Sequence, residues 1–380
     1  MYTRLIHGGG GPDPSTGAIL TPIHQVTTYV QEAVGVHKGF TYTRSGNPTV
    51  KALECVLAAA EGTTERAVAF STGMAATTAL FLSELAAGDH VVCGAVVYGG
   101  TVRLLRQLLQ KFDVRATFVD ATDARNVEAA IETRTKIVFV ETPANPTLVL
   151  TDIAAVARIT RGRARLVVDN TFLTPALQRP LELGADAVLY STTKFLEGHN
   201  TTVGGAILSN DAPFLERLRF VQNAVGFAQS PFEAWLTVRG LKTLPLRMKR
   251  HSDNALRVAE HLERHPRVRA VHYPGLARFP QAELARRQQQ SGGGVLSFEV
   301  EGGVEAGIAV LNSVKLCALA ENLGAVETLI THPASMTHAD VPREDRLRAG
   351  ISDGLVRLSV GLEDAEDVIA DLDRALEVAC

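Results

Sequence analysis

Cysteine is scarce in this sequence, and its few copies lie too far apart to suggest a metal site. The four cysteines, Cys55, Cys93, Cys317 and Cys380, form no CxxC pair, and the histidines show no metal-ligand spacing. This pattern predicts a reduced, cytoplasmic protein without a bound metal. Long apolar runs are also lacking. Charged residues interrupt every hydrophobic stretch before it could span a bilayer, and the first residues lack the apolar core of a signal peptide.

An excess of charge of one sign is absent as well. The formal net charge is −3, and both signs are mixed along the chain, so neither a nucleic acid nor a membrane is an expected partner. Hydrophobic residues make up 46% of the 380 residues. That content allows a sizeable core, and the length is typical of about two domains.

The composition divides the chain into three parts. Residues 1–46 are rich in Gly, Pro and Thr, show no clear period and predict an extended N-terminal arm. From 47 to 245, short β-branched strands alternate with helices, which is typical of a mostly parallel sheet covered on both faces. From 246 to 380, a long helix, three strands and a closing amphipathic helix predict a smaller α+β domain. The predicted fold class is therefore α/β.

Lys194 is the most informative residue because of its surroundings. An apolar strand at 187–189 leads through hydroxyl residues into Lys194, and the strand at 166–168 ends in Asp169. Pyridoxal phosphate requires such a pair at strand ends: the amine forms a Schiff base, and the carboxylate keeps the ring nitrogen protonated. Each residue alone is better explained as a cap or a solvated side chain. Together they predict a pyridoxal-phosphate site, with the hydroxyls available to bind phosphate.

Other candidate residues each have a structural alternative. Gly73 follows a strand and opens a helix, where backbone N–H groups bind phosphate, but an ordinary helix cap has the same pattern. Tyr98 suits ring stacking or proton transfer, or is simply half-buried. Arg357 in an apolar strand must meet an anion, such as a substrate carboxylate, or reach solvent. Tyr42 and Arg44 suit phosphate, although the sequence alone favours a solvated arm.

Several motifs occur in one order along nearly the whole chain, at residues 13–18, 42–49, 141–146, 332–338 and 357–363. With these motifs the chain resembles the cystathionine/methionine-metabolism family of pyridoxal-phosphate enzymes. That family includes cystathionine γ-lyase, cystathionine γ-synthase, cystathionine β-lyase and methionine γ-lyase. The resemblance implies a fold-type I pyridoxal-phosphate fold.

The resemblance also implies roles for the candidate residues. Lys194 would anchor the cofactor and carry protons, Asp169 would pair with the pyridine nitrogen, and Tyr98 would stack on the ring and serve in acid–base steps. The residues implied to bind phosphate are Gly73, Met74, Ser191 and Thr193, and those implied to hold the substrate carboxylate or the cofactor oxygen beside it are Asn145, Ser335 and Arg357. Tyr42 and Arg44 would reach the phosphate of a neighbouring subunit. An obligate dimer, normally doubled to a homotetramer, is therefore implied.

The resemblance does not select one reaction, because family members share α-proton removal and differ at Cβ or Cγ. We expect γ-elimination on a sulfur amino acid, cystathionine first. The segment after Tyr98 has glycine where methionine γ-lyases typically carry a cysteine, which weakens methionine as the main substrate. Glu327 lies in a region that family members use to recognise the distal end of the substrate. The alternatives are methionine γ-lyase, cystathionine γ-synthase or O-acylhomoserine sulfhydrylase, and an inert binding protein, against which the complete Lys–Asp–Arg set argues.

Overall fold

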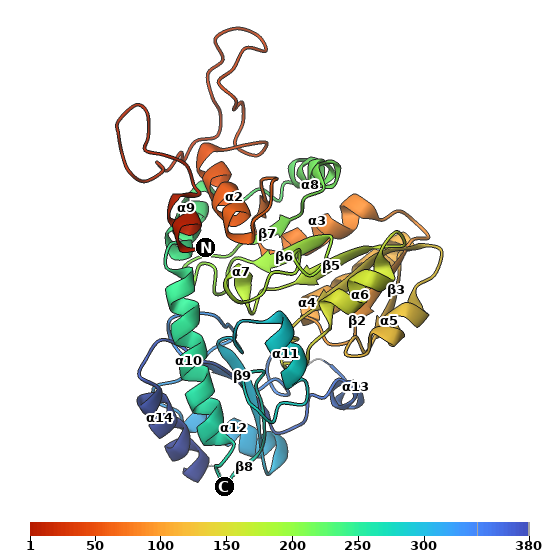
Figure 1. The fold of residues 1–380 in the computed structure, drawn as a ribbon, viewed down its shortest axis with the longest axis vertical. Coiled ribbons are helices and arrows are strands. Elements are labelled where there is room, and N and C mark those ends of the chain that lie inside the picture. Colours follow the sequence, from red (N-terminus) through yellow and green to blue (C-terminus); the bar gives the residue numbers. More distant parts are fainter. Residues whose placement is uncertain (340, 379–380) are drawn as a thin grey trace.

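The computed structural model describes residues 1–339 and 341–378. Two sheets are joined by a long helix, and the N-terminal arm extends from the end of the body that lies opposite the last helix, α14 (Ala365–Val378) (Figure 1). Cys380 lies outside the described residues, and Cys55, Cys93 and Cys317 are free thiols. In the described part of the chain, none of the helices has the length and apolar character needed to cross a membrane.

The larger sheet has seven strands in the order β1-β7-β6-β5-β4-β2-β3. Strands β3, β2, β4, β5 and β6 are parallel, whereas β7 runs antiparallel to both β6 and β1. The predicted mostly parallel sheet is therefore confirmed. The strands are β1 (Val68–Phe70), β2 (His90–Gly94), β3 (Arg115–Val119), β4 (Thr135–Glu141), β5 (Arg165–Asp169), β6 (Ala187–Ser191) and β7 (Gly205–Leu208).

Helices connect these strands and cover the sheet. They are α2 (Pro48–Glu61), α3 (Gly73–Glu84), α4 (Gly99–Arg103), α5 (Ala124–Ala130), α6 (Ile153–Thr160), α7 (Thr174–Leu177), α8 (Ala212–Val225) and α9 (Pro231–Leu241). A π-helical turn (Leu104–Leu108) and a 3-10 turn (Leu109–Phe112) follow α4. Because both faces are covered, the central strands are apolar along their length, and Val138, Val167 and Val188 are fully buried.

The carboxyl ends of β4, β5 and β6 bring distant segments together. In the register of the sheet, Glu141 at the end of β4 pairs with Asp169 at the end of β5, and Asp169 pairs with Leu189 on β6. Lys194 follows shortly after the end of β6. Parallel strands therefore place the acid and the lysine at one edge of the sheet, where α/β folds commonly bind their ligands.

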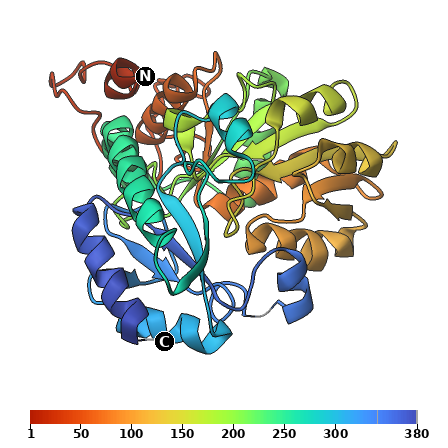
Figure 2. The ribbon, with the colours of Figure 1, turned by 60° about the horizontal axis from the view of Figure 1, so that its bottom comes forward.

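The smaller sheet has five strands in the order β10-β11-β12-β9-β8. Its strands are β8 (Val268–His272), β9 (Val295–Val300), β10 (Ala318–Leu319), β11 (Leu329–Thr331) and β12 (Leu355–Ser359), and its helices are α11 (Ala282–Gln288), α12 (Gly303–Ser313), α13 (Arg343–Arg348) and α14 (Ala365–Val378). The long helix α10 (Leu244–Leu262, green) lies beside α14 (dark blue) (Figure 2). The predicted domain boundary between 245 and 246 falls in the first turn of α10, and the division into domains stays a prediction.

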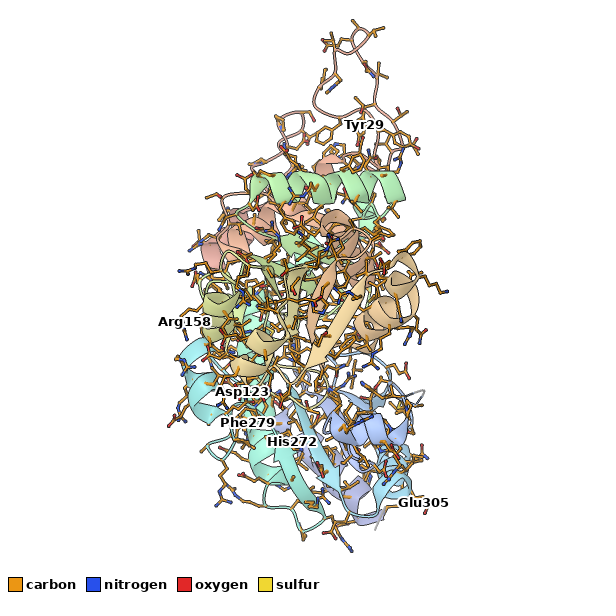
Figure 3. The ribbon with its side chains drawn as sticks, turned by 90° about the vertical axis from the view of Figure 1, so that its right-hand side faces the viewer. Tyr29, Asp123, Arg158, His272, Phe279 and Glu305 are labelled. Atoms are coloured by element: carbon orange, nitrogen blue, oxygen red, sulfur yellow. The ribbon has the colours of Figure 1, made fainter. Side chains whose placement is uncertain are left out.

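The N-terminal arm is mostly irregular but begins with a short helix, α1 (Tyr2–His7), which the sequence did not predict. Leu5 on this helix is fully buried and packs in the same core as α2. The part that carries Tyr29 projects away from the body (Figure 3). There Val30 and Val34 are 95% and 104% exposed. This segment buries little apolar surface within its own chain. Such contacts contribute little to offset the conformational entropy that is lost when the arm is ordered.

Candidate active site

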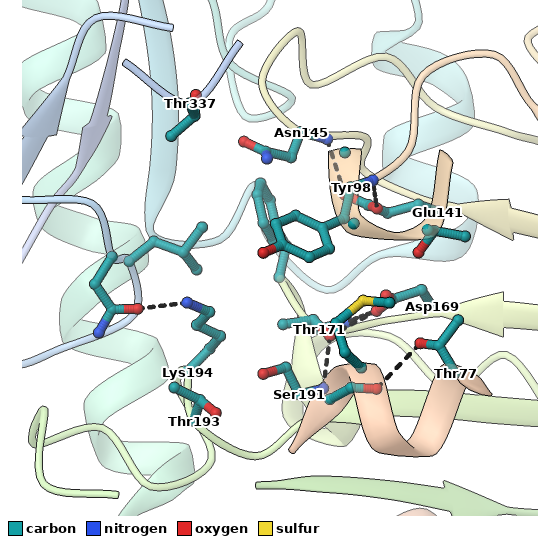
Figure 4. Close-up of a pocket in the computed structure, with 18 of the residues that line it drawn as sticks. Thr77, Tyr98, Glu141, Asn145, Asp169, Thr171, Ser191, Thr193, Lys194 and Thr337 are labelled. Atoms are coloured by element: carbon teal, nitrogen blue, oxygen red, sulfur yellow. Dashed lines mark hydrogen bonds between the residues drawn. The ribbon is translucent and has the colours of Figure 1, made fainter. Parts of the chain in front are cut away.

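A cavity of about 460 Å³ lies at the carboxyl ends of β4, β5 and β6. It is lined from both sheets, because Asp169 ends β5 and Lys194 follows β6 of the larger one (Figure 4). Arg357 comes from β12 of the smaller one. The candidate residues that line this cavity are Gly73, Met74, Tyr98, Asn145, Asp169, Ser191, Thr193, Lys194 and Arg357. The structure thus brings together most of the residues that the sequence singled out.

Lys194 points its amine toward the C-terminal part of the chain. Its Nζ donates a hydrogen bond to Oδ1 of Asn322 at 2.5 Å (Figure 4). Burial lowers the pKa of Lys194 to about 8, and the charge of Arg357 acts in the same direction. A lysine with such a pKa is partly uncharged near neutral pH. Its amine can therefore act as a nucleophile and take up a proton.

Asp169 and Glu141 form a pair of carboxyl groups on neighbouring strands. Oδ1 of Asp169 accepts from the backbone N–H of Thr171 at 3.0 Å and from its hydroxyl at 2.5 Å. Burial raises the pKa of Asp169, and burial together with the nearby Asp169 raises the pKa of Glu141. A positively charged ligand would relieve both the burial and the mutual repulsion of these groups. The pair therefore fits the protonated ring nitrogen of pyridoxal phosphate.

The N-terminus of α3 lies close to Ser191, and both line the cavity, where they could bind a phosphate group from one side. The N–H groups of Gly73 and Met74 belong to the first turn of the helix, where they have no acceptor within the helix. A Cβ atom on Gly73 would lie 3.1 Å from Oγ of Ser191, so any other residue would crowd this serine. The hydroxyl of Thr193 exchanges hydrogen bonds with the backbone of Gly204 at 3.0 and 3.3 Å.

Glu141 positions two candidate residues through their backbone. Its Oε2 accepts from the N–H of Tyr98 at 2.7 Å, and its Oε1 accepts from the N–H of Asn145 at 3.0 Å. The side chain of Tyr98 is 52% exposed and lines the cavity. A Cβ atom on Gly100 would lie 2.5 Å from the Tyr98 ring and 2.7 Å from Sδ of Met74. Glycine at this position therefore allows the tyrosine and the methionine to lie together.

Arg357 is only 4% exposed, so its guanidinium does not reach solvent. Nη1 donates to Oδ1 of Asn145 and Nη2 to the backbone oxygen of Asn322, both at 2.9 Å. Nε is buried and has no hydrogen-bond partner among the described residues. Burial lowers the pKa of Arg357 to about 10. A buried guanidinium that is held by two neutral acceptors and whose Nε–H has no partner is suited to bind a carboxylate.

The comparison with protein families decides the class of this site. A model described as "Cys/Met metabolism PLP-dependent enzyme" matches residues 2–377. The chain belongs to this family. It is therefore a pyridoxal-phosphate-dependent enzyme that acts on sulfur amino acids, as the resemblance implied.

Named relatives of this family member carry out different reactions. The cystathionine gamma-lyase of Bacillus subtilis is 47% identical over 376 residues, covering 99% of this chain and 98% of its own. The cystathionine gamma-synthase of Mycobacterium tuberculosis is 48% identical over 377 residues, covering 98% and 96%. A cystathionine gamma-lyase from Lactobacillus plantarum, solved in complex with L-serine, has a TM-score of 0.96 at 41% identity, covering 100% and 98%. The fold-type I fold is thus confirmed, while lyases and synthases are equally similar.

In this family member, the cavity residues match the parts of pyridoxal phosphate. Lys194 would hold the cofactor covalently, and Asp169 would face the ring nitrogen. The helix N-terminus at Gly73, together with Ser191, would hold the phosphate. These assignments stay predictions, but the paired buried carboxyls, the glycine cradle and the desolvated amine each fit one part of the group.

Tyr42 and Arg44 lie outside the cavity of their own chain. Nη1 of Arg44 donates to the backbone oxygen and to Oδ1 of Asn223, at 2.6 and 2.8 Å. Tyr42 is 46% exposed, and its ring lies 5.7 Å from the Arg44 guanidinium. Their predicted contact with a neighbouring subunit stays a prediction.

Ser335 does not line the cavity either, and its hydroxyl is engaged elsewhere. Its Oγ lies 2.8 Å from Nδ1 of His332, whose Nε2 lies 2.9 Å from the backbone oxygen of Asp353. A carbonyl oxygen only accepts, so Nε2 carries the ring hydrogen and the serine hydroxyl donates to Nδ1. The predicted contact of Ser335 with a substrate carboxylate would therefore require this bond to break.

The cavity also contains residues that the sequence did not single out. Asn322 contacts Lys194 and Arg357, as described above, and Thr171 holds Asp169. The signal for Thr171 was its hydroxyl two residues after an aspartate, a spacing typical of local side-chain turns. Arg103 and Glu321 are exposed residues that line the same cavity.

Replacing Arg357 with alanine is expected to raise KM strongly for every amino-acid substrate. The loss is about 2–5 kcal/mol if the carboxylate pair is desolvated. Steady-state kinetics give KM and kcat, and thermal unfolding checks the fold. Arg250→Ala, which removes an exposed partner of Asp364, is the control and should leave KM unchanged. An unchanged KM in Arg357→Ala would show that another group binds the carboxylate.

Proposed function

We propose that the enzyme is a cystathionine γ-lyase, which converts cystathionine to cysteine, 2-oxobutanoate and ammonia. The observation that supports this substrate is the distribution of charge in the cavity. Arg357 is buried, whereas Arg103 and Glu321 are exposed at the same cavity. Cystathionine carries an ammonium and a carboxylate at each end. Arg357 suits the carboxylate beside the reacting carbons, and Arg103 with Glu321 suits the carboxylate and the ammonium of the far end.

The reaction divides between the cofactor and the residues of the chain. Pyridoxal phosphate, when bound, supplies an electron sink beside the α-carbon of the substrate. Lys194, with its lowered pKa, is suited to remove the α-proton and to return protons to the carbon chain. Tyr98, which is half exposed and lines the cavity, is the second candidate for proton transfer. Glu141 positions the backbone of Tyr98.

Methionine γ-lyase is a weaker alternative for this cavity. The far end of methionine is an apolar methylthio group, which would leave Arg103 and Glu321 without partners. Methionine γ-lyases typically carry a cysteine in the segment after Tyr98, and a bulkier side chain at Gly100 would collide with the Tyr98 ring in its present position. A γ-synthase is the second candidate function, because cystathionine is then the product and would occupy the same cavity. O-acylhomoserine sulfhydrylase would not use Arg103 and Glu321 to bind a charged far end of the substrate.

A substrate panel tests the proposal. The enzyme is given cystathionine, methionine, or an O-acylhomoserine with cysteine, and 2-oxobutanoate, ammonia, thiol and new cystathionine are measured. The proposal predicts the highest kcat/KM for elimination from cystathionine. Arg103→Met and Glu321→Gln should lower that value more than the value for methionine. Faster formation of cystathionine from O-acylhomoserine and cysteine would replace the lyase with the synthase.

We further propose a cytoplasmic homotetramer, built from two dimers with shared active sites. Free thiols at Cys55, Cys93 and Cys317 support a reducing compartment. The exposed apolar side chains of the arm, among them Val30 and Val34, support its docking on another subunit. In that arrangement Arg44 would meet the phosphate of the neighbouring site as a charge-assisted fork.

Mixing two inactive variants tests the shared site. Arg44→Ala and Lys194→Ala, dissociated and reassembled together, are expected to recover roughly a quarter of wild-type activity if chains pair at random. In a mixed dimer, one site then has both an intact arm and an intact lysine. Lys194→Ala with Asp169→Asn is the matched control, since both residues line one cavity and cannot complement. An absence of recovery in the first pair would contradict shared sites while leaving the pyridoxal-phosphate chemistry in place.

A further inference from the structure

A chain of hydrogen bonds leads from the Lys194 amine to the surface. Nζ of Lys194 donates to Oδ1 of Asn322 at 2.5 Å, and Nδ2 of Asn322 donates to Oδ1 of Asn200 at 2.6 Å. Nδ2 of Asn200 then donates to Oε2 of Glu327 at 3.0 Å. Asn322 is half-buried, and Asn200 and Glu327 are exposed. Glu327 is not among the residues that line the cavity, and its role at the distal end of the substrate, suggested by the resemblance, stays a prediction.

The carboxylate of Glu327 determines which way each hydrogen bond in this series points. An asparagine amide has an accepting oxygen and a donating NH₂ group on nearly the same shape, so its partners decide which end points where. An ionised carboxylate only accepts. Glu327 therefore selects the NH₂ end of Asn200, and the free oxygen of Asn200 selects the NH₂ end of Asn322. The oxygen of Asn322 is then the atom that faces the amine of Lys194.

The backbone holds the two segments that carry this chain against each other. The N–H of Val326 donates to the oxygen of Gly198 at 2.9 Å. A Cβ atom on Gly324 would lie 2.6 Å from the backbone nitrogen of Phe195. Asn200 itself has φ = 57°, which is uncommon for a residue other than glycine and which asparagine adopts more readily than most. The side-chain contacts are thus supported by a close approach of the main chain.

We propose that Asn322 holds the amine of Lys194, and that Asn200 and Glu327 are positioning residues that fix the orientation of the Asn322 amide. An oxygen facing the amine favours its protonated form and keeps it at a fixed place beside the substrate carbons. The backbone oxygen of Asn322 also holds Arg357. The proton carrier and the carboxylate anchor are therefore aligned through one residue. The inference rests on the proposed function only for the choice of substrate in the kinetic assay.

Replacing the hydrogen-bond acceptor at position 327 with a donor tests this series of hydrogen bonds. In Glu327→Lys the outer group donates, so Asn200 should turn its oxygen outward and both amides should reverse. An NH₂ group then faces Lys194, and the pKa of Lys194 should fall by roughly one unit. Glu327→Ala should give a smaller decrease, and Glu327→Gln, which retains an acceptor, should stay close to wild type.

The pKa of Lys194 can be measured without any substrate. Full-length protein stripped of cofactor is acetylated with acetic anhydride across a pH series, and the Lys194 peptide is quantified by mass spectrometry. The other titratable side chains of the cavity are unchanged in every variant; they are Arg103, Tyr98, Glu141, Asp169, Glu321, His338 and Arg357. Glu128→Lys, an exposed site on α5, controls for the change in net charge.

The charge introduced by Glu327→Lys could also act on Lys194 directly through space. A double-mutant cycle separates this Coulomb effect from an effect transmitted by the hydrogen bonds. Asn200→Gly removes the middle of this series of hydrogen bonds, and because glycine tolerates φ = 57° it keeps the backbone between positions 194 and 327 in place. In that background, Glu327→Lys should no longer lower the pKa of Lys194, and the measurement is made at high salt to screen exposed charges. The same decrease with and without Asn200 would show a simple charge effect and overturn the proposal, as would an unchanged pKa in Glu327→Lys.

Kinetics of the holoenzyme give a second, independent result. Glu327→Lys and Asn200→Gly should lower kcat for cystathionine roughly threefold to tenfold, with KM nearly constant and a larger isotope effect with α-deuterated substrate. A merely structural contact would change thermal stability without changing this isotope effect, and that outcome would contradict the positioning role. If cystathionine is not the substrate, the Lys194 pKa series still decides the inference.

Discussion

Replacing Lys194 with alanine is expected to lower kcat by more than about 10³-fold. In the proposed mechanism a single amine is both the covalent anchor of the cofactor and the carrier of the α-proton, so its removal would affect two functions. The amine lies in the cavity with a pKa lowered to about 8, which suits it for both. Turnover of cystathionine at saturating pyridoxal phosphate measures the loss. Circular dichroism and thermal unfolding show whether the fold is retained.

Lys249→Ala is the matched control for this change. Lys249 is exposed and forms an ion pair with Asp253 at 2.6 Å on α10, so its loss should leave kcat unchanged. Borohydride should attach the cofactor to the peptide that contains Lys194 in the wild type and in Lys249→Ala, but not in Lys194→Ala. A Lys194→Ala enzyme that retained wild-type turnover would show that another group transfers the proton.

The central pair of the site could be predicted because its signal is local. Short apolar strands that end in polar residues mark the positions of Asp169 and Lys194, and parallel pairing brings strand ends to one edge. The register of β4, β5 and β6 agrees with that expectation. Strand ends therefore carry information about a site before any three-dimensional contact is known.

Other features depend on contacts between distant segments and leave little trace in the sequence. Strand β7 was not predicted, because it is short and begins with glycine. The glycine is required by packing: a Cβ atom on Gly205 would lie 2.4 Å from the backbone oxygen of Thr72. Asn322 likewise meets Lys194 only because the two sheets adjoin. Its type and its neighbours in the sequence give no indication of that contact.

Replacing Asp169 with asparagine is expected to lower kcat on the order of 10²–10³-fold, because a charge that stabilises the electron-accepting ring is lost. Asparagine retains an oxygen that can accept from the N–H and the hydroxyl of Thr171, so the fold should be preserved. The substitution then changes only the charge of the side chain that is proposed to face the ring nitrogen. The absorbance spectrum and kcat of the reconstituted enzyme measure the effect. Wild-type turnover in Asp169→Asn would show that this carboxylate does not pair with the ring.

Although Asp169→Asn should lower kcat, it should stabilise the cofactor-free protein against unfolding near neutral pH. Burial raises the pKa of Asp169, so the folded chain holds this proton more tightly than the unfolded chain does. Its contribution to stability is therefore present at low pH and is lost as the pH rises through the raised pKa.

Asp169→Asn carries no such charge and also relieves the repulsion on Glu141. Without cofactor, its Tm should match the wild type at about pH 4 and exceed it by a few degrees near neutral pH. Added pyridoxal phosphate should reverse the order, because only the wild-type carboxylate gains a cationic partner. A wild type that is the more stable protein at neutral pH both with and without cofactor would contradict this role. The buried acid would then be stabilised by the chain alone.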